Sequence, residues 1–328
     1  MNYYKTLNMT NNNFAWGHAR RFNDYPTFIK SSFGFRVQKI SVNVGFSCPN
    51  RDGTKGIGGC VYCDNNTFKP GYCEPKENIT SQLELGINFF EKKYPDMNYM
   101  AYFQSYTNTY APISELRDMY VEALSHRKIV GLVIGTRPDC VNEEILDMLV
   151  EVTKGKYLTI EFGLESTLNR TLEAINRCHT WDDSVNAINL CYSKGIKVGA
   201  HLILGLPGES ENDMLNHANE LSKLPIHTLK LHQLQITKNT ILAQQYAKAP
   251  ESISLFSFPK YLDFVVRFVE ILNPNIIIER YVSTSPLEKL IAPKWNRMKN
   301  FEIVAQIEKE LEKRNTWQGK NYKNLSSK

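Results

Sequence analysis

Three cysteines lie close together in one glycine-rich stretch of the sequence. Cys48, Cys60 and Cys63 are spaced C-x11-C-x2-C and directly follow a run that is rich in β-branched residues. A closed zinc site or a fully ligated iron–sulfur cube takes four cysteines, so three thiolates leave one metal position for another molecule. The spacing therefore predicts an iron–sulfur cluster with one iron open to a substrate.

A fourth cysteine nearby leaves a second interpretation open. Cys73 lies ten residues beyond Cys63 and could complete a four-cysteine zinc site in a protein that binds metal without catalysis. The stretch between Cys48 and Cys60 is long for a zinc knuckle and too rich in glycine for a helix. That composition favours a loop wrapped around a bulky group.

Length and composition describe a soluble protein with one large domain. The chain has 328 residues, of which 42% are hydrophobic, and α/β barrels of this length often form one unit. Seven cysteines at irregular spacing argue against a disulfide framework and for a reducing compartment. Cys191 is expected in the core, and Cys140 has no assigned role. The sequence shows no run of eighteen apolar residues and no apolar leader, so we expect a cytoplasmic protein without membrane association.

The net charge of +5 is concentrated at the carboxyl terminus. The last sixteen residues contain no acidic side chain and five basic ones, which are Lys313, Arg314, Lys320, Lys323 and Lys328. With Trp317 and Tyr322 interleaved, this tail fits a nucleic-acid contact. A solvated terminus explains the same composition.

Apolar runs alternate with stretches of helical period along most of the chain, which predicts repeated βα units and a parallel sheet. The expected strands are Gln38–Val44, Tyr99–Gln104, Ile129–Gly135, Tyr157–Phe162, Lys197–Leu204 and Thr228–Leu234. The expected helices between them are Ile79–Lys92, Ser114–Arg127, Asn142–Val152, Asp182–Lys194 and Asn212–Leu221. Six strands predict an α/β fold of the partial, open (βα)6 type, similar to a TIM barrel.

The same pattern suggests four segments. Residues 1–36 form an N-terminal segment that lines the barrel mouth or caps its base, and residues 37–235 form the barrel. Residues 236–312 form an α/β extension packed on the barrel, and residues 313–328 form the basic tail. Within the extension we expect helices at Ile241–Tyr246, Tyr261–Leu272 and Glu302–Arg314, the last of which runs into the tail, and a strand at Ile276–Val282.

Several predicted strands end in short polar or glycine-containing signatures. In a parallel barrel these carboxyl ends converge on one face, which carries the active site. The side chains and turns expected there are Gln104, Thr136, Arg137, Glu161, Ser166, Gly205 and Pro207. Structural roles compete with binding roles at three of them: Gln104 could cap backbone, Arg137 could pair with Asp139 or Glu161, and Ser166 could cap a helix.

These motifs resemble the radical S-adenosylmethionine (radical SAM) superfamily and, more narrowly, the bacterial YhcC/YtqA-type family. The long first gap between cysteines departs from the superfamily's usual C-x3-C-x2-C spacing and is similar to that group. A further similarity, through Glu161-x-Gly163-x-x-Ser166, links the chain to the catalytic subunit of Elongator, which modifies wobble uridines of tRNA. The segments that carry the resemblance are Cys48-Pro49-Asn50-Arg51-Asp52-Gly53-Thr54, Gly59-Cys60-x-x-Cys63, Ala101-Tyr102-Phe103-Gln104, Gly135-Thr136-Arg137-Pro138-Asp139-Cys140, Asn176-Arg177-x-His179 and His201-Leu202-x-x-Gly205-Leu206-Pro207-Gly208.

The resemblance implies two cofactors. Cys48, Cys60 and Cys63 would hold a [4Fe–4S] cluster, and an electron donor such as flavodoxin or ferredoxin would reduce it. The open iron would bind S-adenosylmethionine, whose cleavage yields a 5′-deoxyadenosyl radical. The residues expected around S-adenosylmethionine are Gln104 at the methionyl amine, Thr136 and Arg137 at the ribose and carboxylate, Glu161 and Ser166 at the cofactor, and Gly205 and Pro207 at the adenine.

The Elongator similarity implies tRNA as partner and a wobble uridine as substrate. No acetyl-transfer domain is recognisable after the barrel, which favours remodelling of an existing C5 side chain over addition of an acetyl-derived group. A radical SAM enzyme for a small metabolite or a tetrapyrrole is the alternative within the same chemistry. His179 and His201 are expected on the substrate side, and the zinc protein without catalysis is the alternative outside it.

Overall fold

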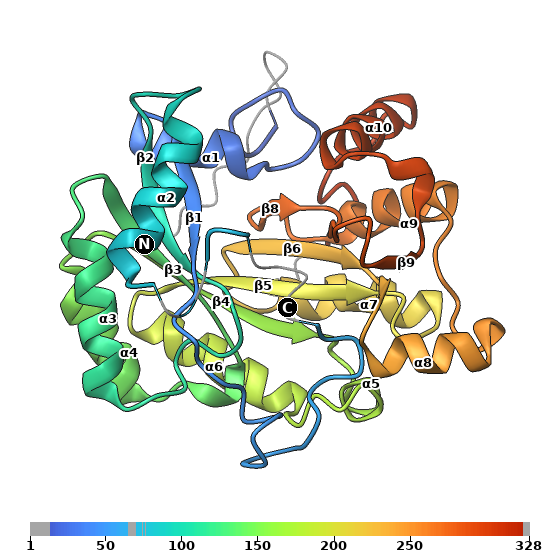
Figure 1. Ribbon diagram of the computed structural model, residues 1–328. Coiled ribbons are helices and arrows are strands. Elements are labelled where there is room, and N and C mark those ends of the chain that lie inside the picture. Colours follow the sequence, from blue (N-terminus) through green and yellow to red (C-terminus); the bar gives the residue numbers. More distant parts are fainter. Residues whose placement is uncertain (1–13, 65–69, 74, 76, 324–328) are drawn as a thin grey trace.

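A computed structural model describes residues 14–64, 70–73, 75 and 77–323. Its centre is a curled sheet of parallel strands in the order β1-β2-β3-β4-β5-β6-β8 (Figure 1). The expected open, partial barrel is therefore confirmed. The strands are β1 Val37–Val42, β2 Asn98–Phe103, β3 Ile129–Thr136, β4 Tyr157–Glu165, β5 Lys197–Leu204, β6 Thr228–Gln233 and β8 Ile277–Arg280. The strand expected at Ile276–Val282 is β8, and it extends this sheet to seven strands by pairing with β6.

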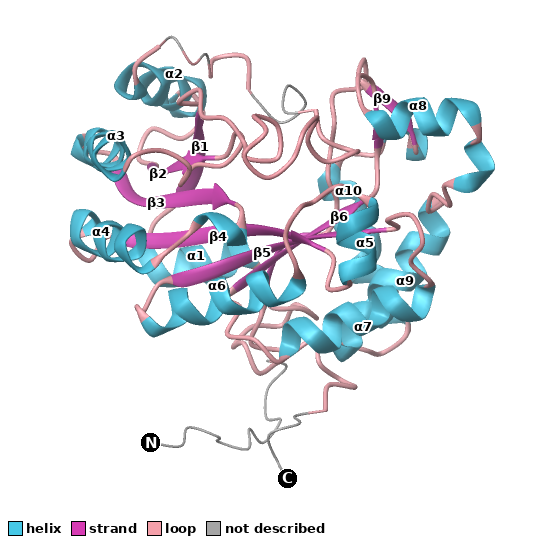
Figure 2. Cartoon of the chain, turned by 90° about the horizontal axis from the view of Figure 1, so that it is seen from below, coloured by secondary structure: helices cyan, strands magenta, loops and turns pink. Residues whose placement is uncertain are grey.

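Helices cover the outer face of the sheet (Figure 2). They are α2 Ile79–Glu91, α3 Ile113–Ser125, α4 Glu143–Thr153, α6 Trp181–Ser193, α7 Glu211–Ser222 and α9 Phe258–Ile271. The short helix α5, Asn169–Ala174, belongs instead to a separate apolar cluster that includes Val61 of the cysteine loop. The later part of the chain adds α8 Ile241–Lys248, α10 Asn300–Lys313 and a small antiparallel sheet of β7 Ile236–Thr237 and β9 Leu290–Ala292. Short 3-10 turns lie at Pro138–Cys140, Pro250–Ser252 and Trp295–Arg297. None of the helices in the described ranges is both long and apolar enough to cross a bilayer.

Alternation along each strand separates an apolar outside from a polar inside. On β1, Ile40 and Val42 are buried in the main core beneath the helices. Lys39, one residue earlier, contacts acidic side chains of β4 and β8 in the barrel interior. The inner face of the sheet therefore carries charged side chains, and one of them, Glu161, borders a cavity.

A short helix closes the base of the barrel. Helix α1, Tyr25–Phe33, begins after Asp24, whose side chain accepts a hydrogen bond from the Thr27 amide. Phe28 packs edge-on against His227, with ring centres 4.9 Å apart, and Phe33 packs against Tyr157 at 5.6 Å. His227 and Tyr157 lie at the amino ends of β6 and β4. Of the two expectations for the N-terminal segment, the structure supports the base rather than the mouth.

The polypeptide after α10 is tied to the same end of the molecule. The buried Gln318 donates from its side-chain amide to the carbonyls of Asn273 and Ile276, which precede β8. Its backbone amide donates to Arg21, and its side-chain oxygen accepts from the Asn23 amide. Residues 315–323 therefore lie near the amino end of β8, away from the carboxyl ends where a barrel site forms.

Candidate functional site

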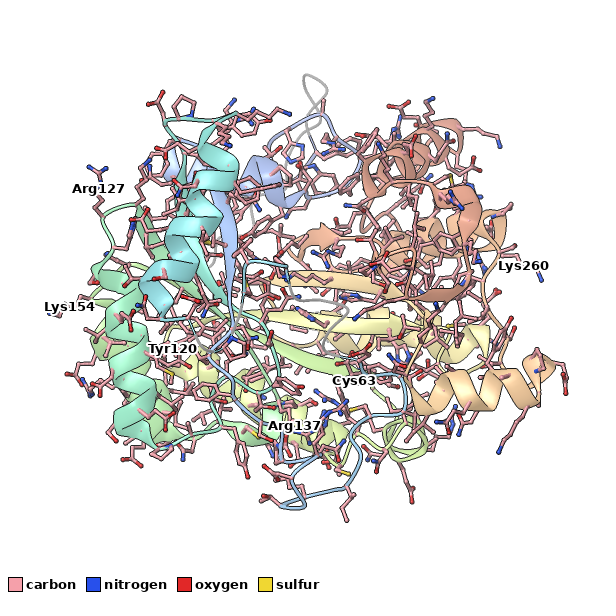
Figure 3. The ribbon with its side chains drawn as sticks, in the orientation of Figure 1. Cys63, Tyr120, Arg127, Arg137, Lys154 and Lys260 are labelled. Carbon is pink, nitrogen blue, oxygen red and sulfur yellow. The ribbon has the colours of Figure 1, made fainter. Side chains whose placement is uncertain are left out.

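A cavity opens at the carboxyl ends of the strands and brings the three predicted cysteines together. It has about 1310 Å³ of space, including the part that is open to solvent. Figure 3 shows Cys63 and Arg137 on the inner side of the molecule, whereas Arg127, Lys154 and Lys260 lie on its outside. The side chains that line this cavity include Cys48, Arg51, Cys60, Cys63, Tyr102, Gln104, Tyr106, Thr136, Arg137, Glu161, Arg177, His201, His232 and Arg280.

The cysteine loop is braced by the segment after α5. Asn50 donates to the carbonyl of Asn176, and Asn176 donates from its side chain to the carbonyl of Gly59 at 2.9 Å. Glycine is required at Gly56, because a Cβ there would lie 2.2 Å from the Asn50 side-chain oxygen and 2.8 Å from Cys178 Sγ. The loop thus has a fixed course between Cys48 and Cys60, which agrees with its glycine content.

Guanidinium groups lie beside the thiols. Arg177 Nη1 is 3.6 Å from Cys60 Sγ, and Arg51 donates to the carbonyl of Cys63 at 2.8 Å. Burial and the neighbouring Cys60 raise the pKa of the Cys63 thiol to about 11, although Arg51 opposes this shift. A metal bound by Cys63 would therefore displace a proton, and the two cations would offset the charge of the resulting thiolates.

The zinc alternative finds less support in this geometry. Cys73 is buried and donates from its thiol to the carbonyl of Ser41 in β1, 3.0 Å away. It is absent from the cavity lining, whereas the three predicted cluster cysteines are present. In the described part of the chain, no group of three or more His, Cys, Asp or Glu side chains is close enough together to hold a metal ion. The thiols of Cys48, Cys60 and Cys63 would have to turn toward a common point to bind a cluster.

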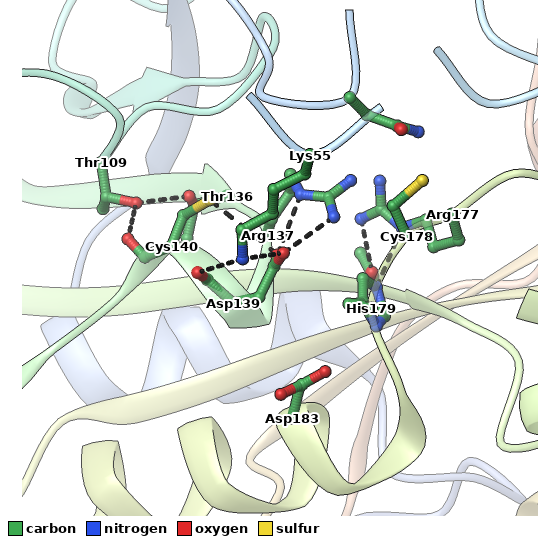
Figure 4. Close-up of polar contacts among 12 residues, drawn as sticks. Lys55, Thr109, Thr136, Arg137, Asp139, Cys140, Arg177, Cys178, His179 and Asp183 are labelled. Carbon is green, nitrogen blue, oxygen red and sulfur yellow. Dashed lines mark hydrogen bonds and ion pairs between the residues drawn. The ribbon is translucent and has the colours of Figure 1, made fainter. Parts of the chain in front are cut away.

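Two predicted cofactor residues lie at the end of β3 (Figure 4). The Thr136 hydroxyl is 2.6 Å from that of Thr109, which in turn donates to the carbonyl of Cys140. Arg137 donates from Nε and Nη2 to the two carboxylate oxygens of Asp139, both at 2.9 Å. This is the ion pair that we considered as a structural role. Arg137 Nη1 is buried and has no hydrogen-bond partner among the described residues, so it can still bind another group.

The Asp139 carboxylate gives a prediction for pH dependence. Burial favours the neutral acid, but hydrogen bonds from Arg137 and Lys55 outweigh it and lower the pKa of Asp139 from 3.8 to about 2. We expect Asp139→Asn to lose about 2 kcal/mol of unfolding free energy at neutral pH. A carboxyl with a depressed pKa stabilises the fold above its unfolded pKa, so the difference from wild type should vanish as the pH falls from about 4 through about 2. Chemical unfolding across this range measures it, and a pH-independent difference would contradict the assignment.

A buried ionic network fills the barrel below the cysteines. Glu161 of β4 accepts hydrogen bonds from Lys39 at 2.7 Å, from Lys230 of β6 at 2.6 Å and from the Tyr102 hydroxyl at 2.7 Å. His201 Nε2 is 3.0 Å from the same carboxylate. Burial opposes ionisation, but the two lysines lower the pKa of Glu161 well below its ordinary value. Glu161 is interior, as expected, and its direct partners are these protein groups.

The remaining predicted residues take more varied positions. Gln104 lines the cavity, and its side-chain oxygen is 3.4 Å from the Ser41 hydroxyl. Ser166 is buried outside the lining, where it donates to Glu209 at 2.5 Å and accepts from the amide of Leu168 next to α5. Gly205 and Pro207 are also absent from the lining. Their contacts with S-adenosylmethionine stay proposals.

The structure also shows where the two histidines, Cys178 and Cys191 lie. His201 lines the cavity, whereas His179 lies behind it and accepts a hydrogen bond from Arg177 Nε at 3.0 Å (Figure 4). Burial and the Arg177 charge lower the pKa of His179 to about 3. Cys191 is in the main core, as expected, and Cys178 contacts the cysteine loop near Gly56.

The sequence motifs left several residues of the cavity and of the buried network beside it without a role. Lys39 and Lys230 each interrupt an apolar strand, which is the same signal that identified Glu161. Arg177 belongs to the motif Asn176-Arg177-x-His179, but its proximity to Cys60 depends on the folded chain. The sequence around Arg280 did not show whether its side chain faces the cavity, because that orientation depends on an irregularity in the pairing of β8 with β6.

Comparisons with known proteins show the family of this chain. Residues 42–221 match the Radical SAM superfamily, and residues 226–313 match the Radical_SAM C-terminal domain. YtqA of Bacillus subtilis, named as an uncharacterized protein, is 34% identical over 318 residues, which cover 97% of this chain and 98% of that protein. YhcC of Escherichia coli K12 is 36% identical over 265 residues, which cover 80% of this chain and 84% of that protein.

More distant matches include a solved structure and a tRNA uridine(34) acetyltransferase. The structure of Elp3 from Methanocaldococcus infernus aligns with a TM-score of 0.65 at 16% identity and covers 87% of this chain. The chain spans 64% of the length of that protein, and this likeness concerns the fold alone. The tRNA uridine(34) acetyltransferase of Methanocaldococcus jannaschii is 27% identical over 149 residues, which cover 42% of this chain and 27% of that protein.

Members of the Radical SAM superfamily use a [4Fe–4S] cluster and S-adenosylmethionine. The cavity fits both groups, because three cysteines line it beside two guanidinium groups and the buried Arg137 Nη1 is a donor without a partner. A carboxylate is the acceptor that best matches such a guanidinium. By its family match, its relatives along nearly the whole length and this donor set, the chain belongs to the radical SAM superfamily, in the group that includes YtqA and YhcC.

Proposed function

We propose that this radical SAM enzyme modifies the C5 side chain of a wobble uridine in tRNA. The observation that carries the radical step is the joint lining of one cavity by Cys48, Cys60 and Cys63 with Arg137. The tRNA substrate is supported by the partial match to a tRNA uridine(34) acetyltransferase and by the fold shared with Elp3.

The chain's own residues have distinct roles in this proposal. Cys48, Cys60 and Cys63 would hold the cluster, and Arg137 Nη1 would bind the carboxylate of S-adenosylmethionine. These cofactors supply a one-electron cleavage that yields a 5′-deoxyadenosyl radical. Gln104 would accept the methionyl amine, and the closed base under α1 keeps bulk water from that end of the barrel.

An aromatic side chain at the mouth suits an unstacked base. Tyr106 follows β2, lines the cavity and is 39% exposed. Its backbone has a positive φ of 63°, a conformation that residues other than glycine rarely adopt and that occurs often at functional sites. A uridine taken out of its stack binds well on such a ring. We therefore place the RNA contact at the mouth, whereas Trp317 and Lys320 of the basic tail lie toward the amino end of β8.

Modified nucleosides from cells test this substrate. Deletion of the gene is expected to change the C5 modification of wobble uridines in total tRNA, because the precursor side chain would accumulate. Mass spectrometry of nucleosides from deletion and parent strains measures the change. A plasmid copy should restore the parent pattern, and a copy with Cys48, Cys60 and Cys63 replaced by alanine should not. Identical nucleosides in both strains would remove tRNA as the substrate and favour a small molecule.

A further inference from the structure

Arg280 is directed into the cavity by a β-bulge. In the pairing of β6 with β8, Leu229 lies opposite Ile278, and the next residue, Lys230, lies opposite Arg280. Glu279 is the additional residue between them. A bulge of this kind breaks the alternation, so two consecutive side chains face the same side. Glu279 contacts the interior lysines, and Arg280 lines the cavity.

The acidic groups near Arg280 already have other partners. Glu279 is 2.6 Å from Lys39 and 3.2 Å from Lys230, and Glu161 binds the same two lysines. Among the described residues, the Arg280 side chain makes no hydrogen bond, ion pair or cation–π contact. An arginine side chain is always charged and is costly to bury without an anion. The cavity therefore contains a half-buried cation that no anionic side chain of the described residues pairs with.

His232 supplies a second unused donor position. It is the next inward residue of β6 after Lys230, and its ring centre is 5.4 Å from that of His201. Its Nε2 is buried and has no hydrogen-bond partner among the described residues. Burial, with the nearby His201 and Arg280, lowers the pKa of His232 well below its ordinary value, so the ring is neutral. A neutral imidazole can donate one hydrogen bond without adding charge.

We propose that Arg280, assisted by His232, binds an anionic group of the substrate. This inference rests on the proposed function, in which a uridine enters the cavity, and it adds that the substrate carries a carboxylate or a phosphate near the reacting carbon. A guanidinium binds either anion through two parallel hydrogen bonds. A carboxylate would belong to the C5 side chain and a phosphate to the nucleotide backbone.

Binding of small nucleosides separates these sources. The anaerobically purified protein with its cofactors is titrated in a calorimeter with 5-carboxymethyluridine, uridine 5′-monophosphate and the neutral 5-hydroxymethyluridine. We expect one of the two anions to bind about 10- to 100-fold more tightly than the neutral nucleoside, as a charge-assisted hydrogen bond implies. Arg280→Gln should abolish this preference, and Arg280→Lys should keep part of it. Arg127→Gln is the control, since Arg127 is exposed on the outer surface and its loss removes the same charge (Figure 3).

Each outcome has a separate meaning. Tight binding of 5-carboxymethyluridine that needs Arg280 assigns the anion to the C5 side chain, and tight binding of the monophosphate assigns it to the backbone. Equal affinity for all three compounds, no binding, or a preference that survives in Arg280→Gln overturns the inference. Unfolding midpoints of the variants identify any loss of fold, and Arg280→Lys then decides. If the preference depends on Arg280 but tRNA nucleosides do not change in the deletion strain, only the proposed tRNA substrate fails.

Discussion

Replacement of Cys48, Cys60 and Cys63 by alanine is expected to abolish both the cluster and the cleavage of S-adenosylmethionine. The wild-type protein, purified without oxygen, should be brown and should contain about four irons per chain. The triple variant should be colourless, with iron near background, because Cys48, Cys60 and Cys63 are the only cysteines that line the cavity in the described part of the chain. Iron analysis and chromatographic detection of 5′-deoxyadenosine after chemical reduction measure the two losses.

Cys73→Ala is the matched control for this experiment. Its thiol binds the carbonyl of Ser41 outside the cavity lining, so the variant should keep its colour, its iron and its cleavage activity. A protein that contains one zinc, and that loses it in Cys73→Ala, would support the four-cysteine site instead. Wild-type protein with a full iron content but no 5′-deoxyadenosine would contradict the proposed radical step.

Removal of the Glu161 charge should have the largest effect on stability. Glu161→Gln leaves Lys39 and Lys230 in a buried interior with only Glu279 between them. Loss of one partner from a buried ion pair typically costs about 3 to 5 kcal/mol, because the remaining charge is uncompensated. We expect a loss of this size in the free energy of unfolding of the cofactor-free protein, measured with chemical denaturant. Coincident transitions by fluorescence and circular dichroism would justify a single free energy.

Two further variants define this result. Glu151→Gln removes a carboxylate of the same kind from the protein surface, where it pairs with Arg117, and should leave the unfolding midpoint almost unchanged. Glu161→Gln combined with Lys230→Met removes one of the uncompensated charges and should recover part of the loss. Equal midpoints for Glu161→Gln and Glu151→Gln would mean that the interior network contributes little to stability.

The repeat pattern determined most of the fold, because each βα unit carries its own periodicity. The strand expected at Lys197–Leu204 has the observed bounds, and the helices beside the central strands were found within a few residues. Helix α1 was missed because its aromatic side chains pack on distant residues at the base of the barrel, and these contacts cannot be seen in the local sequence. Helix α5 and the strands β7 and β9 are too short for a periodic signal and depend on contacts with distant segments.

The site was predictable where function depends on spacing and unpredictable where it depends on register. The spacing of Cys48, Cys60 and Cys63 predicts a cluster. Arg137 follows the end of a strand, and a parallel barrel brings the carboxyl ends of its strands to the face that carries the cavity. Simple alternation would have placed Glu279 and Arg280 on opposite faces of β8. The bulge that turns both inward appears only when the strand is paired with β6.

The seam between the two ends of the polypeptide has a consequence for synthesis on the ribosome. Asn23 and Asp24 hold the free edge of β8 through backbone contacts at Ile278, and Gln318 bonds to the same region. The first of these residues leaves the exit tunnel roughly tens of seconds before its partners are translated. Until β8 is translated, β6 lacks its neighbour in the sheet, and its open edge is a site for pairing with other chains. The exposure of this edge therefore falls once β8 has paired with β6 and Asn23, Asp24 and Gln318 have bonded beside it.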